Sequence, residues 1–385
     1  MTILRGAGAV VTVVVLMLGM GGCAAEPVGG GSAERGWVEL DELPFESRDS
    51  SVLVWTGEEV VVLGGASGPP CPPNADCMVG PLERGGAALD PDIGSWREIA
   101  PAPHPIALDR GVFADGKVFV QADSAEAPGI LMWYSLADDV WEQIAVPGDG
   151  VPRTMVADGG DVLFVVGSHE FGAGSDLVLD SRTGEWDELP SDPLGTAFDR
   201  YMTPTPEGIL LTAKELVDSP GSEEPSLVEV ALLDRDAGTW ERLPDAEQIG
   251  GWDWRWTGVR VVDVALGGGD GGEINGWGRE YPFGGMLELP GGEWSPLPDP
   301  PAWPGEGWLE RAVGGDRFLV GSGHVFDDIE ETWTPIAKPA GAPDVAGQAI
   351  WAGHRLIVIG GTDWSGWDGT RSSQVWMVSA GSASG

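Results

Sequence analysis

One phrase recurs seven times along the chain and constrains its fold more than any other feature. In each copy an aspartate or a turn leads to glycine or a polar pair, then to tryptophan, and then to a short strand that ends near proline. The seven tryptophans are Trp37, Trp96, Trp141, Trp186, Trp240, Trp294 and Trp333. Self-similarity of this kind, with a period of about 45 residues, predicts a repeat architecture.

A second pattern accompanies the tryptophan phrase. Each of the last six copies is preceded by a turn and an apolar strand that often runs into glycine. These strands cover 58–65, 117–121, 161–167, 208–213, 260–266 and 317–321, and a seventh, 355–361, follows the last phrase. The chain therefore forms seven complete units only if the N-terminal strand that contains Trp37 belongs to the C-terminal unit.

A unit of four short antiparallel strands cannot bury both of its faces alone, so such units stack radially on their neighbours. Pairing the first strand with the last unit removes the exposed edge that a linear array would leave. We therefore predict an all-β, seven-bladed β-propeller over residues 37–385, closed by the N-terminal strand in the C-terminal blade.

Composition agrees with many strands and turns. Glycine (61 residues) and proline (31) are spread between short apolar runs, and hydrophobic residues make up 42% of the chain, enough for a core. The chain has 21 basic and 61 acidic residues, which gives a net charge of −40. This balance excludes binding of nucleic acid or of an anionic membrane surface by phosphate neutralisation.

The repeat resembles the kelch repeat, whose signature is a double glycine after the second strand and an aspartate turn leading to tryptophan after the third. Gly64-Gly65 and Gly360-Gly361 match the double glycine fully. The resemblance covers about 37–385 and implies a propeller like the central domain of galactose oxidase. Kelch-like propellers include carbohydrate oxidases and a sialic-acid mutarotase, so the resemblance also admits an enzyme.

The N-terminus predicts export. One cation, Arg5, precedes an apolar run over 9–18 that is too short for a stable membrane span. The run ends in Met20-Gly21-Gly22-Cys23, which resembles the bacterial lipobox. We expect a signal peptide over 1–22, a lipidated Cys23, a flexible tether over 23–36 and a lipoprotein on the extracytoplasmic side of the membrane. The alternative is an ordinary secretory signal.

Only Cys71 and Cys77 remain, within the segment CPPNADC. Export favours a disulfide between them, which would staple a small loop and contribute about 2 kcal/mol. A metal site would need more ligands than this segment supplies. The expectation is no metal and no cofactor.

Aromatic residues beyond the seven repeat tryptophans gather in the predicted long loops of the last three blades. Loops between second and third strands and the connections between blades emerge on one face, which usually carries the ligand; we call it the long-loop face. The candidate binding residues there are Trp252, Trp277, Tyr281, Trp364 and Trp367, and Trp254, Trp256, Trp303 and Trp308 belong to the same group. The alternative is that these rings fill gaps between blades.

Arginine recurs near the start of the first strand of a blade. The residues are Arg48, Arg110, Arg153, Arg200, Arg255 and Arg311, of which Arg110, Arg153, Arg200 and Arg311 are the candidates for an anionic ligand at the channel mouth. Because most of them neighbour an acidic residue, structural ion pairs are the alternative.

No nucleophile and base, and no metal ligands, stand at a recognisable spacing. The sequence therefore favours a binding module for an extracytoplasmic glycan, peptide or protein, with the membrane engaged only through the lipid. The alternative is a carbohydrate-active enzyme, mutarotase-like or glycosidase-like, with its site at the mouth of the central channel.

Overall fold

The computed structural model describes residues 36–72, 75, 77–123, 129–148, 151–219, 225–251, 253–265, 281–299 and 308–380. Contacts divide the chain into Met1–Ala33 and Glu34–Gly385, and the described residues all belong to the second unit. The expected signal peptide, Cys23 and most of the expected tether lie outside the described residues. Within the described part of the chain, no helix has the length and apolar character needed to cross a membrane.

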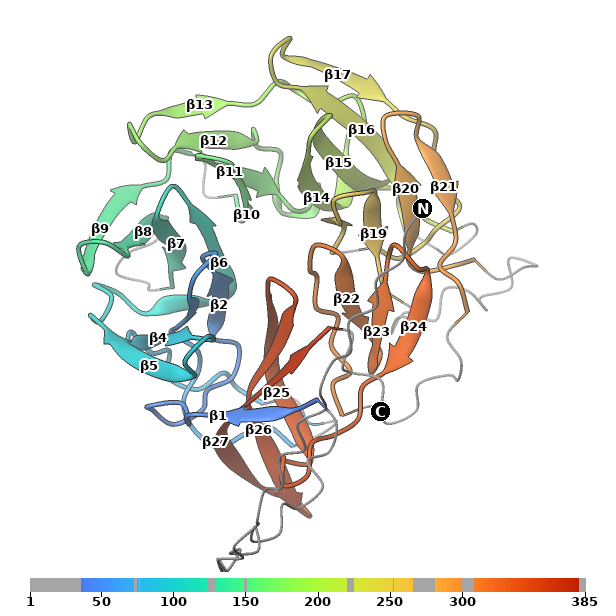
Figure 1. Cartoon of the computed structure of the whole chain (residues 1–385). Helices are drawn as coiled ribbons and strands as arrows, with labels where there is room; N and C mark the ends of the chain where they lie inside the picture. The colour runs from blue at the N-terminus through green and yellow to red at the C-terminus, as the bar shows by residue number, and fades with distance from the viewer. Residues whose placement is uncertain are drawn as a thin grey trace, which may run out of the picture. The chain divides into compact units, whose positions relative to one another are not determined.

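Seven antiparallel sheets are arranged in a ring around a central channel (Figure 1), which confirms the predicted seven-bladed β-propeller. Six sheets have four strands. The sixth blade in chain order has three strands, and an isolated bridge between Val313 and Val320 stands where its innermost strand would be. Blades are numbered in chain order below.

The strands fall into four sets according to their place in a blade. The innermost strands are β2 (Val52–Trp55), β6 (Ile106–Ala114), β10 (Arg153–Asp158), β14 (Ala197–Thr205), β18 (Arg255–Trp256) and β25 (Val345–Ala352). The second strands are β3 (Val60–Leu63), β7 (Lys117–Ala122), β11 (Asp161–Val166), β15 (Gly208–Glu215), β19 (Val261–Asp263), β22 (Phe318–Gly321) and β26 (Arg355–Ser365). These second strands match the apolar runs of the sequence.

The outer half of each blade follows the same order. The third strands are β4 (Gly86–Asp90), β8 (Ile130–Ser135), β12 (Leu177–Asp180), β16 (Glu229–Asp234), β20 (Gly285–Glu288), β23 (His324–Asp327) and β27 (Asp368–Ser379). The outermost strands are β5 (Ser95–Ile99), β9 (Val140–Ala145), β13 (Trp186–Glu188), β17 (Thr239–Arg242), β21 (Glu293–Ser295), β24 (Thr332–Pro335) and β1 (Val38–Leu40). One short 3-10 helix, η1 (His169–Phe171), lies between β11 and β12.

The N-terminal strand closes the ring as predicted. β1 pairs antiparallel with β27, and Val38, Glu39 and Leu40 lie opposite Met377, Trp376 and Val375. Figure 1 shows β1 against β27, at the two ends of the colour scale. Because β1 forms the outer edge of blade 7, the first and last strands of the propeller share one sheet.

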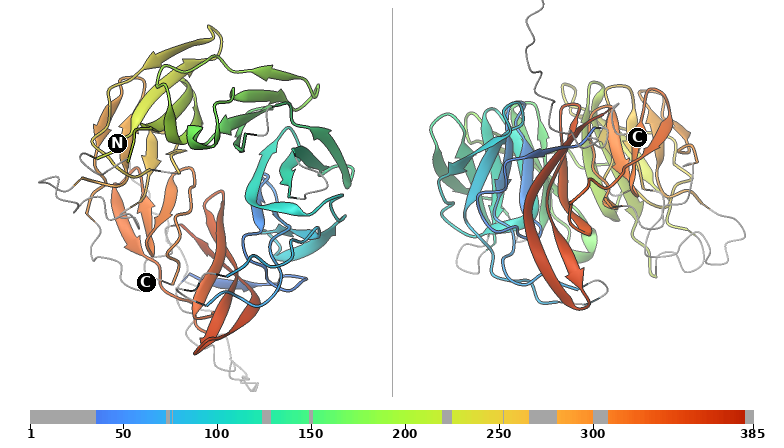
Figure 2. Two further views of the ribbon diagram at one scale, coloured as in Figure 1. Left: turned by 180° about the vertical axis from the view of Figure 1, so that it is seen from behind. Right: turned by 60° about the horizontal axis from the view of Figure 1, so that its bottom comes forward.

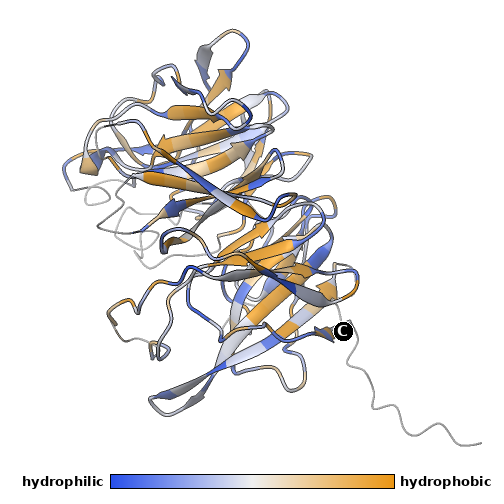
Figure 3. Ribbon diagram, turned by 90° about the vertical axis from the view of Figure 1, so that its left-hand side faces the viewer, coloured by the Kyte–Doolittle hydropathy of each residue, from blue (hydrophilic) through white to orange (hydrophobic). Residues whose placement is uncertain are grey.

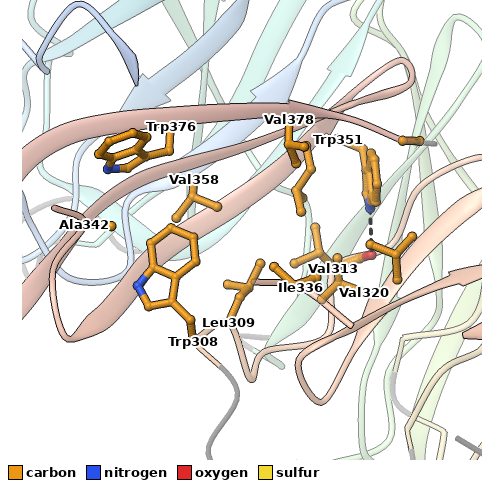
Figure 4. Close-up of a cluster of buried hydrophobic side chains, with 13 residues drawn as sticks. Trp308, Leu309, Val313, Val320, Ile336, Ala342, Trp351, Val358, Trp376 and Val378 are labelled. Carbon is orange, nitrogen blue, oxygen red and sulfur yellow. Dashed lines mark hydrogen bonds between the residues drawn. The ribbon is translucent and has the colours of Figure 1, made fainter. Parts of the chain in front are cut away.

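The core lies between neighbouring blades. All four residues of β3 are buried, and β11 is buried over its last five residues, because their sheets are covered on both faces. Figure 3 shows hydrophobic residues concentrated on the strands and hydrophilic residues on the connections. The cluster in Figure 4 is typical: it contains Val320 of blade 6 together with Trp351, Val358 and Trp376 of blade 7.

The recurring phrase has a specific role at each seam between blades. The indole Nε1 of the repeat tryptophan donates a hydrogen bond to a backbone carbonyl just after the outermost strand of the preceding blade. The pairs are Trp37 to Ala337 (2.9 Å), Trp96 to Asp41 (2.9 Å), Trp141 to Ala100 (2.6 Å), Trp240 to Pro190 (2.8 Å), Trp294 to Pro244 (2.9 Å) and Trp333 to Pro298 (2.8 Å). Each copy of the phrase thus supplies an indole donor to the preceding blade and a carbonyl acceptor to the following blade.

Trp186 is the exception. Its Nε1 is buried and has no hydrogen-bond partner among the described residues. Its ring still packs on Phe164 of its own blade, with 4.8 Å between ring centroids. The seam between blades 2 and 3 therefore lacks the indole bond that the other six seams have.

The double glycines mark places where neighbouring backbone comes close. Gly64 and Gly65 have φ angles of +62° and +88°, which L residues rarely adopt. A Cβ at Gly64 would lie 2.7 Å from Cβ of Ile106 in the next blade, and one at Gly360 would lie 2.3 Å from Oγ of Ser47. Glycine at these positions thus lets the next blade approach.

Trp141 and Trp186 form a matched pair for testing the indole bond. Both rings are half-buried and pack on an aromatic ring of their own blade, but only Trp141 donates across a seam. We expect Trp141→Phe to lower the free energy of unfolding by about 1 kcal/mol more than Trp186→Phe does. Chemical denaturation measures both losses, and equal losses would show that the bond adds nothing to stability.

Candidate functional site

The long-loop face carries a hairpin where the sequence predicted an irregular loop. The sequence predicts a long loop around Trp364 and Trp367; instead β26 and β27 continue as paired strands, with Trp364 opposite Gly369, to a turn at Gly366 and Trp367. The prediction was wrong because a register shift between Ile359 and Gly361 restores strand pairing beyond the double glycine. Gly366, with φ +68°, allows the tight turn.

The hairpin is braced against two segments of blade 1, the segment before β2 and the loop between β3 and β4. Both terminal nitrogens of Arg371 lie 2.6 Å from the carboxylate of Asp49, and its Nε donates to the carbonyl of Gly68 at 3.0 Å. Cys71 and Cys77 in this loop form the predicted disulfide. Figure 2 shows β26 and β27 extending past the neighbouring strands beside this loop.

A glycine in the hairpin makes this contact possible. A Cβ at Gly369 would lie 2.6 Å from Cγ of Pro70 and 2.8 Å from the ring of Trp364. The ring of Trp364 therefore crosses the hairpin over Gly369 and is half-buried. Trp367, at the turn, is 75% exposed.

Some of the exposed large apolar side chains in the described part of the chain lie on the same face, and others lie on the opposite face. In each blade the innermost strand begins, and the second strand ends, at this face. Its exposed apolar residues are Met78, Val79, Phe171, Val217, Val345 and Trp367. Met78 and Val79 are 96% and 64% exposed and belong to the loop that braces the hairpin. Such side chains are candidates for contact with a partner.

The other aromatic candidates divide into three groups. Trp252, Trp277 and Trp303 lie outside the described residues. Trp254 and Trp308 are buried, so the alternative that they fill gaps between blades is correct for these two; Figure 4 shows Trp308 within the core. Tyr281 is half-buried ahead of β20, and Trp256 is half-buried in β18.

Two of the candidate arginines bind protein oxygens on the long-loop side. Arg153 is buried and donates to the carbonyls of Ser175 and Val151. Arg200 is buried and contacts the carboxylates of Asp176 and Asp192, each at 2.8 Å. The contacts of Arg200 match the alternative of structural ion pairs and connect β14 to Asp176 of blade 3, whereas the printed contacts of Arg153 are with backbone carbonyls of its own blade.

No described contact joins the two remaining candidates to Arg153 or Arg200. Arg311 is exposed and does not line the channel cavity, and the side chain of Arg110 lies outside the described residues. The expected convergence of Arg110, Arg153, Arg200 and Arg311 on one ligand therefore has no counterpart among the described side chains.

The central channel holds a cavity of about 730 Å³ that is lined by the innermost segments of all seven blades. In blades 2, 4 and 7 the lining residues come from the second half of the strand, Val112 in β6, Tyr201 in β14 and Ile350 in β25. The cavity therefore lies toward the turns between first and second strands, away from the long loops.

One arginine outside the four candidates, Arg255, does line this cavity. Arg255 lies beside Asp253, with 2.7 Å between NH2 and Oδ1. The signal in the sequence was the spacing of Asp253 and Arg255, two positions apart where the chain enters β18. Trp254, between them, is buried in the core.

The comparisons with known proteins assign no family: no family model matches the chain, and no curated protein matches it. Among the described residues, no group of three or more His, Cys, Asp or Glu side chains is placed to hold a metal ion.

His169 gives this face a pH-dependent contact. Its Nδ1 accepts a hydrogen bond from the backbone N–H of Ala197 at 2.9 Å, which requires that nitrogen to be unprotonated. Burial, and then the positive charge of Arg200, lower the pKa of His169 below its ordinary value of 6.5. The unfolded chain therefore binds a proton near pH 6.5 that the folded chain does not bind, and stability is lost as the pH falls through this value.

We expect His169→Asn, whose side-chain oxygen can accept the same bond, to reduce the loss of melting temperature between pH 7.5 and pH 5.5. Carboxylates with ordinary pKa values stay ionised in this range, and the other three histidines are present in both proteins. Thermal melts at a series of pH values measure the effect. An identical pH profile in the variant would contradict the assignment.

Proposed function

We propose that the chain is an exported, membrane-tethered binding module that captures a protein partner with its long-loop face. The observation that carries the proposal is Trp367, an exposed tryptophan at the tip of a hairpin that Arg371 and Asp49 hold against blade 1. A rigid support reduces the entropy that an aromatic anchor loses on binding. Tryptophan is also among the residues that dominate binding energy at protein interfaces.

The neighbouring side chains favour a protein over a glycan. Met78 and Val79, on the bracing loop, are exposed but offer no strong hydrogen-bonding group, which a glycan surface would require. They suit an apolar pocket on a protein. Asp363 and Asp368 are exposed on the hairpin, and the chain carries a net charge of −40, so the partner's rim is expected to be basic.

Two further parts of the proposal rest on the sequence. The double glycines Gly64-Gly65 and Gly360-Gly361 support membership of the kelch class of propellers. The apolar run over 9–18 and the segment ending in Cys23 support export and lipid anchoring. An enzyme is less well supported, because Arg153 and Arg200 are engaged by protein oxygens instead of facing the channel.

Photo-crosslinking tests the binding face. A photo-crosslinking amino acid in place of Trp367 is expected to capture a distinct protein in intact cells, whereas the same group in place of Ile329 is not. Ile329 is 55% exposed and lies in the turn between β23 and β24, at the opposite face, so it is a matched control.

The captured protein is then purified and its affinity measured. We expect Trp367→Ala to weaken binding at least tenfold with an unchanged melting temperature, and Ile329→Ala to change neither. No crosslink specific to position 367, or equal affinity of the Trp367→Ala variant, would refute the proposed face.

The anchor is tested separately. Cys23→Ser should move the protein from the membrane fraction to the soluble extracytoplasmic fraction or block its maturation, because the serine cannot carry the thioether-linked lipid. The double variant Cys71→Ser/Cys77→Ser should remain with the membrane. Membrane retention of the Cys23→Ser protein would rule out lipidation at this cysteine.

A further inference from the structure

The channel cavity carries a pair of opposite charges that the proposed face does not use. Arg255 and Asp253 both line the cavity, and their side chains are 46% and 36% exposed. A partly solvated pair of this kind keeps hydrogen-bonding capacity for a ligand: the guanidinium has five N–H donors and the carboxylate several acceptor sites. The pair therefore offers donors and acceptors side by side.

The arginine is held in place by its surroundings. A Cβ at Gly314 in blade 6 would lie 2.5 Å from Cγ and 2.7 Å from Nε of Arg255, so only glycine leaves room for this side chain. On its other side the guanidinium carbon lies 5.9 Å from the ring centroid of Tyr201 in blade 4. Arg255 thus spans the seams on both sides of blade 5.

Arg255 and the neighbouring Tyr201 also keep the same protonation states near neutral pH. The electrostatic influence of Tyr201 and then of Asp253 raises the pKa of Arg255, which therefore stays charged. Burial raises the pKa of Tyr201, so its hydroxyl stays protonated near neutral pH and can donate or accept a hydrogen bond. Behind Asp253, the carboxylate of Asp263 accepts the backbone N–H of Asp253 at 3.4 Å.

Aromatic residues from four blades are among those that line the cavity. Trp55 of blade 1, Phe113 of blade 2, Tyr201 of blade 4 and Trp256 of blade 5 all line the cavity and are half-buried. Their outer parts pack into the clusters between blades, which fixes them. A ligand with an apolar face could stack on such rings.

The charges of the lining decide the class of ligand. Its ionisable side chains are Asp253, Arg255, Asp316 and the neutral Tyr201, so the lining has a slight negative excess. An anion would meet two carboxylates in an acidic protein, and an organic cation would meet the guanidinium. A neutral polyhydroxylated ring can donate to Asp253, accept from Arg255 and place its C–H face on a ring.

We propose that the cavity binds a neutral mono- or disaccharide between the Asp253–Arg255 pair and the aromatic rings of the channel wall. The volume of about 730 Å³ falls in the range of small-molecule sites. The site is separate from the hairpin and does not depend on the proposed protein partner.

Binding is tested with a panel of glucose, galactose, N-acetylglucosamine, maltose and trehalose, with choline and acetate as charged probes. Saturation-transfer NMR detects binding to the wild-type protein, and titration of tryptophan fluorescence gives the affinity. We expect at least one sugar to bind. Arg255→Gln and Asp253→Asn should each weaken it at least tenfold, and Arg182→Gln, an exposed arginine of blade 3, should leave it unchanged.

A second variant tests whether the position of the Arg255 side chain matters as well as its charge. Gly314→Ala keeps Arg255 but displaces its side chain, so it should also weaken sugar binding while melting temperatures report whether each variant is folded. Trp367→Ala should bind sugar like the wild type, which distinguishes this site from the protein-binding face. The proposal is overturned if no sugar binds, if choline or acetate binds in preference, or if folded Arg255→Gln binds sugar with unchanged affinity.

Discussion

The hydrogen bond from a repeat tryptophan to the preceding blade is the contact on which the propeller depends. It joins outermost strands, which are otherwise the most exposed parts of each blade, and it repeats at six of the seven seams. Apolar packing between blades supplies most of the stabilisation but has no direction. The indole bond adds direction, because its donor and its acceptor must be in register before it forms.

This bond explains why the fold could be predicted from the sequence. Trp240 and the Pro190 carbonyl belong to successive copies of one phrase. The number of copies of the phrase therefore equals the number of seams between blades. The closure by β1 was predictable for the same reason, since Trp37 needs a preceding blade and finds it at Ala337. The double glycines marked places where the backbone is crowded, after the end of β3 in blade 1 and within β26 in blade 7.

The candidate site was less predictable because it depends on contacts between distant segments. Nothing near Trp364 in the sequence reveals that Arg371 contacts Asp49, and a stretch rich in glycine and aspartate is typical of a loop. Arg200 was separated from the channel by Asp176 and Asp192, which lie in other segments. Trp254 and Arg255 are neighbours in the chain, but Trp254 is buried in the core and Arg255 lines the cavity, and composition alone could not assign these positions.

The closure by β1 also sets an order for folding. Its partner strand β27 ends at Ser379, so the pairing that seals the ring joins the two ends of the propeller. Blades 1 to 6 can form from neighbouring segments as the chain is made, but blade 7 needs a strand made at the very start. Closing so long a loop has a high entropic cost unless the intervening blades are already folded. Until synthesis is complete, β1 must therefore remain available without pairing elsewhere, and its length of only three residues limits the wrong partners it could find.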